Sequence, residues 1–177
     1  MSVFKTYSLE SLGEFSNRSE KLAIFERDPV KGADEFFQKI MINKFKIKGQ
    51  VFRNNSYNHI KSLIESVVPK KVNSEPFYSI WLNDMSDMCK YFCDFLKIGS
   101  VGFSLGTKRV CKRYHVDNVP MRLLVTYAGK GTEWIPDEFV DRNAYENGLP
   151  NESILKNPSR SKFINTWDVA IFRGGSD

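Results

Sequence analysis

A change in hydrophobic period near Gly99 constrains the fold of this chain more than any other feature. Before Gly99, apolar residues recur every three to four positions, as they do on the buried face of an amphipathic helix. After it, short apolar runs are broken by Gly, Pro and Asn, which is typical of strands joined by turns. The sequence therefore predicts an α+β fold in which a mainly helical N-terminal half, residues 1–98, packs on a C-terminal antiparallel β-sheet, residues 99–177.

The helical half divides into four expected elements. A short strand is expected at residues 22–25, and helices are expected at residues 33–45, 56–68 and 80–97. Gly49 stands after the first helix as a stop signal. The third helix has the broadest apolar face, so it is expected to lie in the core.

The second half is expected to hold four strands, at residues 100–105, 109–117, 121–127 and 168–173. The segment 143–165 is polar and contains Gly and Pro, which predicts a long loop or lid. The 177 residues suffice to bury a core without disulfides or metals, so a single domain, 1–177, is expected.

Composition and the N-terminal sequence indicate the cellular compartment in which the protein is expected. The chain has no run of eighteen apolar residues, so a membrane span is not expected. The N-terminus lacks the apolar stretch and small-residue cleavage site of a secretory signal. The three cysteines are an odd number, which favours a reducing environment over a disulfide framework. We therefore expect a cytoplasmic protein with no membrane partner.

The positive charge of the chain is concentrated between residues 38 and 73, where eight basic residues accompany one acid, Glu65. The basic residues are Lys39, Lys44, Lys46, Lys48, Arg53, Lys61, Lys70 and Lys71. Such a window can attract phosphate backbones, but no nucleic-acid motif accompanies it. A solvated helix face is the favoured interpretation, and nucleic acid is a less favoured partner.

His115 and Asp117 are the strongest candidates for chemistry. Residues i and i+2 of a strand point to the same side, so the imidazole and the carboxylate can converge on one metal ion. His-x-Asp supplies two of the three ligands of the facial triad that binds non-heme Fe(II). The third ligand is missing from the pattern, because the other histidine of the chain, His59, lies upstream.

The order of elements around this motif is similar to that of double-stranded β-helix Fe(II)/2-oxoglutarate oxygenases. A His-x-Asp strand is followed by an apolar strand, a long loop and the strand at residues 168–172. The resemblance implies an incomplete, cupin-like double-stranded β-helix, a divalent metal with Fe(II) favoured over zinc, and 2-oxoglutarate as a possible small-molecule ligand. If the protein is an enzyme, the resemblance implies an Fe(II)-dependent oxygenase-like activity.

Several residues are candidates for a pocket beside the metal. Thr126, Tyr127 and Trp134 could line it, with Tyr127 donating a hydrogen bond to a bound carboxylate. Arg173 or Arg122 could pair with such a carboxylate through two parallel hydrogen bonds. The alternative for all five is sheet packing and surface charge, which is the better interpretation of Arg122.

Cysteines offer a second metal hypothesis. Cys89 and Cys93 lie one helical turn apart, and Cys111 and His115 are also separated by four positions. These four side chains have the ligand types of a structural zinc site. The alternative is that Cys89, which falls within the apolar stripe of its helix, packs as a small hydrophobe.

With these residues in view, the chain resembles the bacterial family catalogued as domain of unknown function number 1826. The matching segments are Leu22-Ala23-Ile24-Phe25-Glu26-Arg27, Cys111-x-x-Tyr114-His115-x-Asp117, Arg122-Leu123-Leu124-x-Thr126-Tyr127-x-Gly129-x-Gly131-Thr132-Glu133-Trp134, Asp141-Arg142 and Asp168-Val169-Ala170. The family pattern continues into a His-Arg-Ser-Pro segment that this sequence lacks, and Lys130 stands where the family commonly has Pro. The family name implies no reaction.

The absent segment leads to an expectation about assembly. A β-helix without its closing strands would leave residues 169–172 as an unpaired edge, and exposed edges pair with other chains. We therefore expect a homodimer through this C-terminal strand, or aggregation, unless the N-terminal helices cover the edge. Three functions compete at this point: a metal-binding, oxygenase-like protein; a non-catalytic binding or structural domain in metal homeostasis or nucleic-acid contact; and a structural zinc protein.

Overall fold

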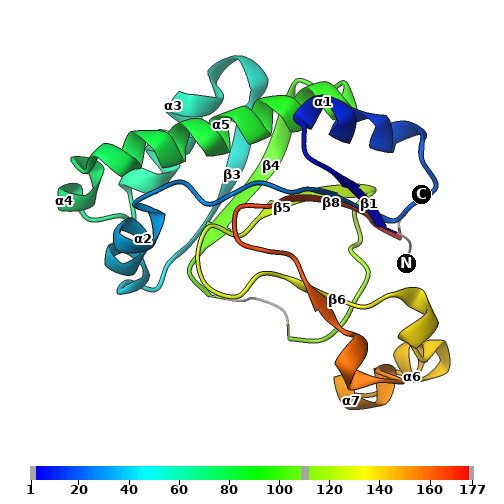
Figure 1. Ribbon diagram of the computed structural model, residues 1–177. Helices are drawn as coiled ribbons and strands as arrows, with labels where there is room; N and C mark the ends of the chain where they lie inside the picture. Colours follow the sequence, from blue (N-terminus) through cyan, green and yellow to red (C-terminus); the bar gives the residue numbers. More distant parts are fainter. Residues whose placement is uncertain (1–2, 109–111, 176–177) are drawn as a thin grey trace. The chain divides into compact units, whose positions relative to one another are not determined.

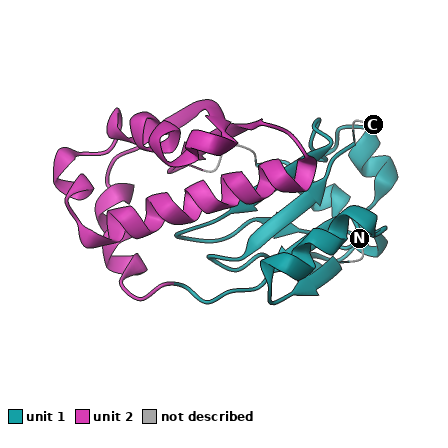
Figure 2. Ribbon diagram, turned by 90° about the horizontal axis from the view of Figure 1, so that it is seen from above, with its two compact units in different colours: residues 1–29, 111–177 teal, residues 30–110 magenta. Residues whose placement is uncertain are grey.

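A computed structural model describes residues 3–108 and 112–175 of the chain (Figure 1). The fold is mixed α and β, as the sequence predicts at this coarser level. The chain divides into two compact units (Figure 2): unit 1 comprises residues 1–29 and 111–177, and unit 2 comprises residues 30–110. This division differs from the expected boundary at residue 98, and a single domain spanning the whole chain stays a prediction.

A four-stranded sheet forms the centre of unit 1. Its strands are β1 (Val3–Thr6), β2 (Leu22–Phe25), β8 (Val169–Arg173) and β5 (Met121–Val125), which lie side by side in that order. β1 and β2 are parallel, whereas β8 is antiparallel to both of its neighbours. The N-terminal segment therefore contributes two strands to a sheet that the sequence assigns to the C-terminal half. A cupin-like double-stranded β-helix is not confirmed by this topology.

The strand β8 lies inside this sheet, so the expected unpaired edge at residues 169–172 is wrong. Its partner on one side is β2, with Phe25 opposite Val169, and its partner on the other side is β5, with Val125 opposite Val169. Val169, Ala170 and Ile171 are fully buried. A short continuous apolar run is what a strand covered on both faces requires. The reason for expecting a homodimer through this strand falls away with the edge.

Short elements surround the sheet of unit 1. They are α1 (Leu9–Leu12), η1 (Gly13–Asn17), β6 (Glu133–Trp134), η3 (Asp137–Phe139), α6 (Arg142–Glu146), α7 (Asn151–Ile154), η4 (Pro158–Arg160) and β7 (Lys162–Phe163). β6 and β7 pair in antiparallel fashion. The first two elements connect β1 to β2, and the others precede β8 in the chain.

The segment 143–165 is therefore more structured than the expected loop. Polar residues in and just before it act as helix caps: the side chain of Asp141, two residues before the segment, accepts a hydrogen bond from the Ala144 N–H, and the Asn157 side chain accepts one from the Ser159 N–H. Ala144 and Ile154 belong to a small buried cluster of unit 1. Capping residues and turn residues are the same types, so composition alone could not separate the two.

Unit 2 contains the three helices that the sequence predicts: α2 (Ala33–Met41), α3 (Ser56–Glu65) and α5 (Pro76–Leu96). It also contains two short helices that the sequence analysis did not predict, η2 (Arg53–Asn55) before α3 and α4 (Lys70–Asn73) before α5. Pro76 is the first residue of the 21-residue helix α5. A backbone N–H in the first turn has no acceptor within the helix, so proline, which lacks the N–H, fits there without loss of a hydrogen bond. α5 buries Trp81, Leu82 and Met85 along its apolar face, which confirms its predicted place in a core.

The strand β3 (Lys46–Phe52), which the sequence analysis missed, pairs with β4 (Ser100–Gly106) in unit 2. Gly49 is not a helix stop but lies in the middle of β3. A Cβ atom at this position would come within 2.7 Å of the Leu63 Cδ1 atom, so the glycine lets α3 approach the strand. Ile47 and Val51 are buried on one face of β3 and alternate with exposed polar residues.

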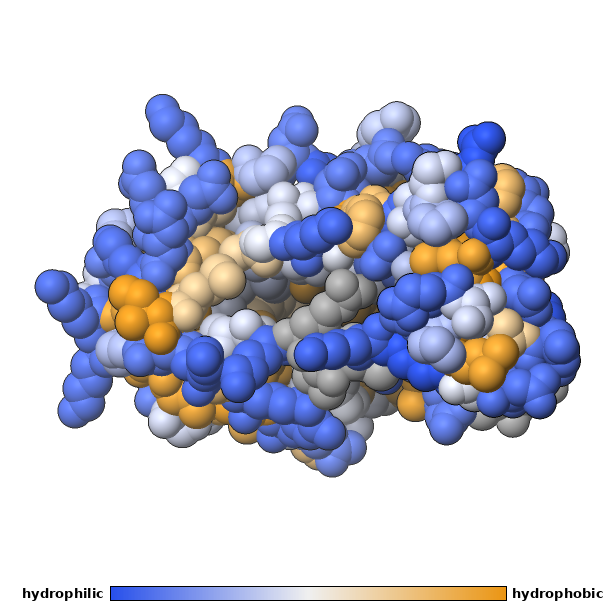
Figure 3. All heavy atoms as spheres, turned by 90° about the horizontal axis from the view of Figure 1, so that it is seen from below, coloured by the Kyte–Doolittle hydropathy of each residue, from blue (hydrophilic) through white to orange (hydrophobic). Residues whose placement is uncertain are grey.

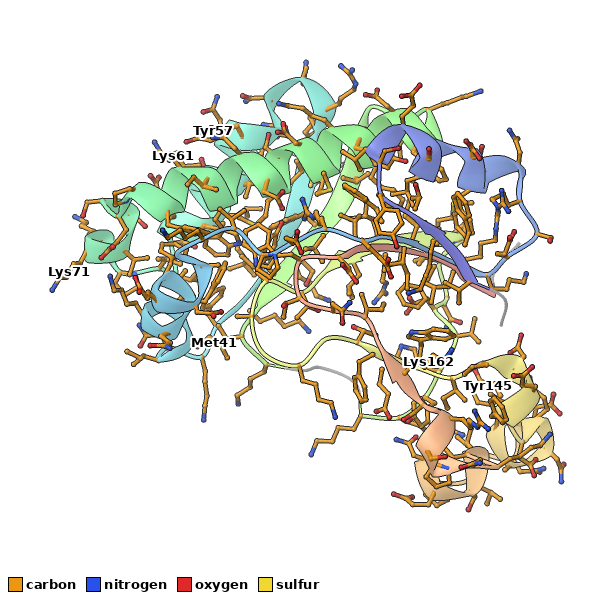
Figure 4. The ribbon with its side chains drawn as sticks, in the orientation of Figure 1. Met41, Tyr57, Lys61, Lys71, Tyr145 and Lys162 are labelled. Atoms are coloured by element: carbon orange, nitrogen blue, oxygen red, sulfur yellow. The ribbon has the colours of Figure 1, made fainter. Side chains whose placement is uncertain are left out.

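Exposed apolar side chains lie in separate groups on the face of the molecule drawn in Figure 3, which is mostly hydrophilic. In unit 2, Met41 and Ile42 are exposed at the end of α2, where Figure 4 labels Met41. Isolated exposed hydrophobics of this kind are ordinary on protein surfaces. Within the residues that the structure describes, no helix has the length and apolar character needed to cross a membrane.

Candidate functional site

His115 and Asp117 lie in an extended loop before β5, not on the expected strand at residues 109–117. The described part of that range, from residue 112 onward, forms no strand, and residues 109–111 lie outside the described residues. The loop is fixed by the backbone beyond β8: the Gly174 N–H donates to the Pro120 carbonyl, and the Gly175 N–H donates to the Asp117 carbonyl, each at 2.9 Å. Two glycines at the end of β8 therefore position the candidate ligands.

The structure nevertheless brings the two side chains together as the i, i+2 spacing predicts. His115 Nε2 lies 3.3 Å from Asp117 Oδ1. The other ring nitrogen, Nδ1, lies 2.9 Å from the Arg113 carbonyl oxygen, which can only accept, so Nδ1 carries the hydrogen. The second carboxylate oxygen, Asp117 Oδ2, accepts from Arg122 Nε at 3.0 Å. The imidazole is half exposed, and the carboxylate is mostly buried.

This arrangement has a chemical consequence. With hydrogen on Nδ1, a neutral His115 directs the lone pair of Nε2 toward the carboxylate, where only a proton or a cation relieves the repulsion. A histidine that donates its other N–H to a backbone carbonyl has the orientation usual for metal ligands. For metal–ligand bonds of about 2.1 Å, an N···O separation of 3.3 Å corresponds to a ligand–metal–ligand angle of roughly 100°.

Within the described part of the chain, a third protein ligand does not accompany the pair. Among residues 3–108 and 112–175, no three His, Cys, Asp or Glu side chains are grouped so that they could hold a metal ion. His59 lies on α3 in unit 2, where its Nδ1 accepts a hydrogen bond from the Phe52 N–H. The pair fits two adjacent coordination positions of a cation, and it does not fit a complete facial triad.

The predicted pocket residues lie at both ends of β8. The antiparallel register places Met121 of β5 beside Arg173, near the His115 loop, and Val125 beside Val169, at the opposite end. Thr126 and Tyr127 follow Val125, so they lie far from His115. The Thr126 carbonyl accepts from the Trp167 N–H at 2.8 Å, and the Tyr127 ring contacts the Trp167 ring edge-on, with centroids 5.0 Å apart.

Arg173 holds the N-terminal segment. Its guanidinium donates to the carbonyls of Phe15, Arg18 and Glu20 and covers the Phe15 ring at 4.6 Å. These contacts give the side chain a packing role at the end of β8, as the alternative interpretation of the sequence suggested.

Trp134 lines a cavity of about 560 Å³ in unit 1, near the start of β8. Lys162 of β7, labelled in Figure 4, lines the same cavity, and its ammonium lies 5.4 Å from the centre of the Trp134 ring. The sequence analysis missed four carboxylates at this cavity: Glu26, Asp137, Glu138 and Asp168. The family-like blocks at residues 22–27 and 168–170 contained two of them, but nothing in the sequence indicated that these distant blocks meet.

Backbone strain occurs beside this cavity. Trp167 has a φ of 73°, a left-handed conformation that a bulky side chain rarely adopts. Its N–H bond to Thr126 and the Arg27 guanidinium on its carbonyl hold the peptide in place. Such strain persists where the surrounding contacts over-determine it. It aims the next residue, Asp168, toward the N–H groups of Arg27 and Asn165.

The four residues of the zinc hypothesis are divided between the units. Cys89 and Cys93 are buried on α5 in unit 2, His115 belongs to unit 1, and Cys111 lies outside the described residues. Burial raises the pKa of Cys89 to about 12 and also raises the pKa of Cys93. A zinc ligand must be a thiolate, and burial in apolar surroundings opposes that form.

The buried acids of α5 predict a pH dependence of stability. Burial raises the pKa of Cys89 from 9.0 to about 12 and that of Tyr78 from 10.0 to about 12, so the folded protein retains protons that the unfolded chain loses. The stabilisation is complete below pH 9 and is lost as the pH rises toward 12. We expect the free energy of unfolding to fall by about 2–3 kcal/mol between roughly pH 8 and pH 10.5.

Urea titrations of the wild type and of Cys89→Ala at the two pH values measure this decrease in the free energy of unfolding. The variant should show a smaller decrease than the wild type. Equal decreases would contradict the role of Cys89.

Several charges of the basic window between residues 38 and 73 are paired with acids. Figure 4 shows two of its lysines, Lys61 and Lys71, at separate places on unit 2. Lys39 is paired with Glu75 at 2.8 Å, Lys61 with Glu65 at 3.7 Å, and Arg53 with Asp94. These partners include two acids from outside the window, which sequence counting could not assign. The favoured interpretation as a solvated surface therefore gains support.

Comparisons with known proteins identify the family. No curated protein and no solved structure is detectably similar to the chain. One family model, described as "Protein of unknown function (DUF1826)", matches residues 7–176. That match includes the His115 loop, all of unit 2 and, apart from Val3 and Lys5, the residues that line the cavity of unit 1. The chain thus belongs to the family described as Protein of unknown function (DUF1826).

Proposed function

We propose that unit 1 binds a divalent cation through His115 Nε2 and Asp117 Oδ1. The observation that supports this proposal is the 3.3 Å separation of the two atoms, together with an imidazole oriented by the Arg113 carbonyl. Imidazole and carboxylate ligands suit Fe(II) and other borderline cations, whereas structural zinc sites commonly include thiolates. Fe(II) is therefore the favoured ion.

Two protein ligands leave most coordination positions of such an ion open. Water or a chelating acid such as 2-oxoglutarate would fill them, and the bound cation would act as a Lewis acid toward the chelating oxygens. What this chain contributes is orientation of the imidazole, a mostly buried carboxylate, and an arginine at its second oxygen. An oxygenase-like reaction and a cupin-like β-helix remain predictions from the resemblance, and an experimental structure of the Fe(II)-loaded protein would test both.

Titration of the protein with Fe(II) under anaerobic conditions tests the proposal. We expect weak binding by the wild type and at least about tenfold weaker binding by His115→Ala, because ligand loss costs more than loss of a supporting contact. His59→Ala is the matched control, since it removes the other histidine of the chain and leaves unit 1 intact. Equal binding by wild type and His115→Ala would sink the proposal, as would equal losses in both variants.

Arg122→Gln gives a test in the opposite direction. Arg122 Nε occupies Asp117 Oδ2 and places a positive charge beside the proposed ion, although the arginine side chain is itself half exposed. Exposed ion pairs contribute about 0.2–1 kcal/mol, so the variant should bind Fe(II) about threefold more tightly. Weaker Fe(II) binding by Arg122→Gln would mean that Arg122 supports the site rather than competing with the cation.

A further inference from the structure

The cavity of unit 1 carries an inference beyond the proposed function. Its volume of about 560 Å³ falls in the range of small-molecule sites. It lies at the start of β8, next to Asp168, whereas the His115 loop contacts Gly174 at the other end. Six residues of extended chain span about 20 Å, so the two sites are separate.

Asp168 is a buried acid that makes no ion pair with another residue of 3–108 or 112–175. The residue is only 3% exposed, and its carboxylate accepts one backbone N–H on each oxygen, from Arg27 and from Asn165, both at 3.2 Å. A carboxylate has about four acceptor positions, so capacity remains on the side that lines the cavity. Lys5 also lines the cavity, but its ammonium is hydrogen-bonded to Glu26. This hydrogen bond is the main cause of the raised pKa of Lys5, and the charge of Asp168 is a smaller cause. A buried carboxylate is costly unless a cation compensates it.

Aromatic rings on the same cavity already attract cations. The Lys162 ammonium lies 5.4 Å from the Trp134 ring, and the Lys130 ammonium lies 3.8 Å from the Phe163 ring. Both rings line the cavity. The faces of aromatic rings stabilise positive charge, and they do so best when water is excluded. Carboxylates beside aromatic faces form the combination that recognises amines and guanidinium groups.

The charge of the lining points in the same direction. Four carboxylates and two ammonium groups line the cavity of a protein whose net charge is +5. Lys5 neutralises Glu26, and Arg142 pairs with Asp137. Glu138 makes no ion pair or hydrogen bond with another residue in the part of the chain that the structure describes. Apolar side chains occupy much of the remaining wall, and no described cluster there has the three ligands of a metal site.

We propose that this cavity binds a small organic cation, an amine or a guanidinium compound, with its charge between Asp168 and Glu138 and its carbon skeleton against Trp134. Asp168 supplies the buried counter-charge, and Glu138 supplies the charge at the surface. The indole face of Trp134 covers the apolar part. The Lys162 ammonium lies over the Trp134 ring, so a ligand cation would compete with Lys162 for that ring.

Calorimetric titrations with 1,4-diaminobutane, tetramethylammonium and guanidinium chloride test this assignment, with sodium succinate as the anionic counterpart. We expect at least one of the three cations to bind at sub-millimolar to millimolar concentration and succinate to bind more weakly. Glu138→Gln should weaken cation binding by about threefold, as expected for an exposed charge. Glu146→Gln, which removes an exposed carboxylate of unit 1 away from the cavity, should leave it unchanged.

Asp168→Asn should abolish cation binding, and circular dichroism of this variant shows whether it folds. Because that variant loses one of two acceptors for backbone N–H groups, the Glu138→Gln titration carries the test if Asp168→Asn unfolds. Failure of all three cations to bind at millimolar concentration would overturn the proposal. So would preferential binding of succinate, or cation binding that Glu138→Gln leaves unchanged. None of these outcomes depends on Fe(II) binding at His115.

Discussion

Alanine in place of Gly174 is expected to destabilise the protein by about 3 kcal/mol and to weaken Fe(II) binding at His115 and Asp117. A Cβ atom at this position would lie 1.8 Å from the Val119 carbonyl oxygen and 2.5 Å from the Asp117 carbonyl oxygen. Both obstacles are backbone atoms, so relief of the clash must move the loop that carries the two candidate ligands. Urea unfolding followed by circular dichroism measures the stability, and anaerobic titration measures the binding.

Gly175→Ala is the matched control for this substitution. A Cβ atom at Gly175 would meet only the end of the Val116 side chain, at 3.3 Å, and that side chain is exposed and can move. Its expected cost is below about 1 kcal/mol, as for surface changes that meet a yielding neighbour. Similar stabilities of the two variants would contradict the close packing of the His115 loop against Gly174.

Truncation of Ile171 to alanine is expected to cost about 3 kcal/mol. Ile171 is fully buried in β8, between Ala23 of β2 and Leu123 of β5. Removal of its side chain therefore leaves a cavity in the buried interior, away from solvent. The free energy of unfolding in urea gives the effect directly.

Leu149→Ala provides the comparison for Ile171, because Leu149 is 45% exposed in the same unit. Its truncation should change stability by less than about 0.5 kcal/mol. A comparably small effect at Ile171 would mean that β8 lies at an exposed edge, as the sequence alone suggested.

The helices of unit 2 were predictable because their stabilising contacts repeat along the chain. The apolar positions of α5 recur with the helical period, and they coincide with its buried face. Phe36, Phe37 and Ile40 of α2 follow the same rule. The strand β3 also shows alternation, but Gly49 interrupts it, and the reason for that glycine is the contact with Leu63, a residue of the following helix. A tertiary contact of this kind leaves no periodic signal.

The sheet of unit 1 depends on pairings between the two ends of the chain. β2 shows as an apolar tetrapeptide, but nothing local indicates that Phe25 pairs with Val169. Without that pairing, β8 looks like an edge that lacks its closing strand. β1 is amphipathic over only four residues, too short for a periodic pattern to be recognised.

The candidate site was predicted in part. The i, i+2 spacing correctly indicated that His115 and Asp117 meet, although a loop, not a strand, brings them together. Trp134 was expected in a pocket beside the metal, which stays a prediction; the cavity that Trp134 lines lies beside Asp168. The antiparallel pairing of β5 with β8 places His115 and Asp117 at one end of β8 and the cavity beside Asp168 at the other. The sequence contains no signal for this pairing and its register.

Paramagnetic broadening by Mn²⁺ tests the proposed cation site most directly. In ¹⁵N–¹H spectra of the labelled 177-residue chain, a trace of Mn²⁺ should broaden the amide signals of residues 115–117 and of Gly174 and Gly175, whose backbone contacts the loop. It should spare the amides around Asp168, at the other end of β8, and His115→Ala should restore the broadened signals. Broadening centred on Asp168 and Glu138, or broadening that His115→Ala leaves in place, would contradict a cation site at His115 and Asp117.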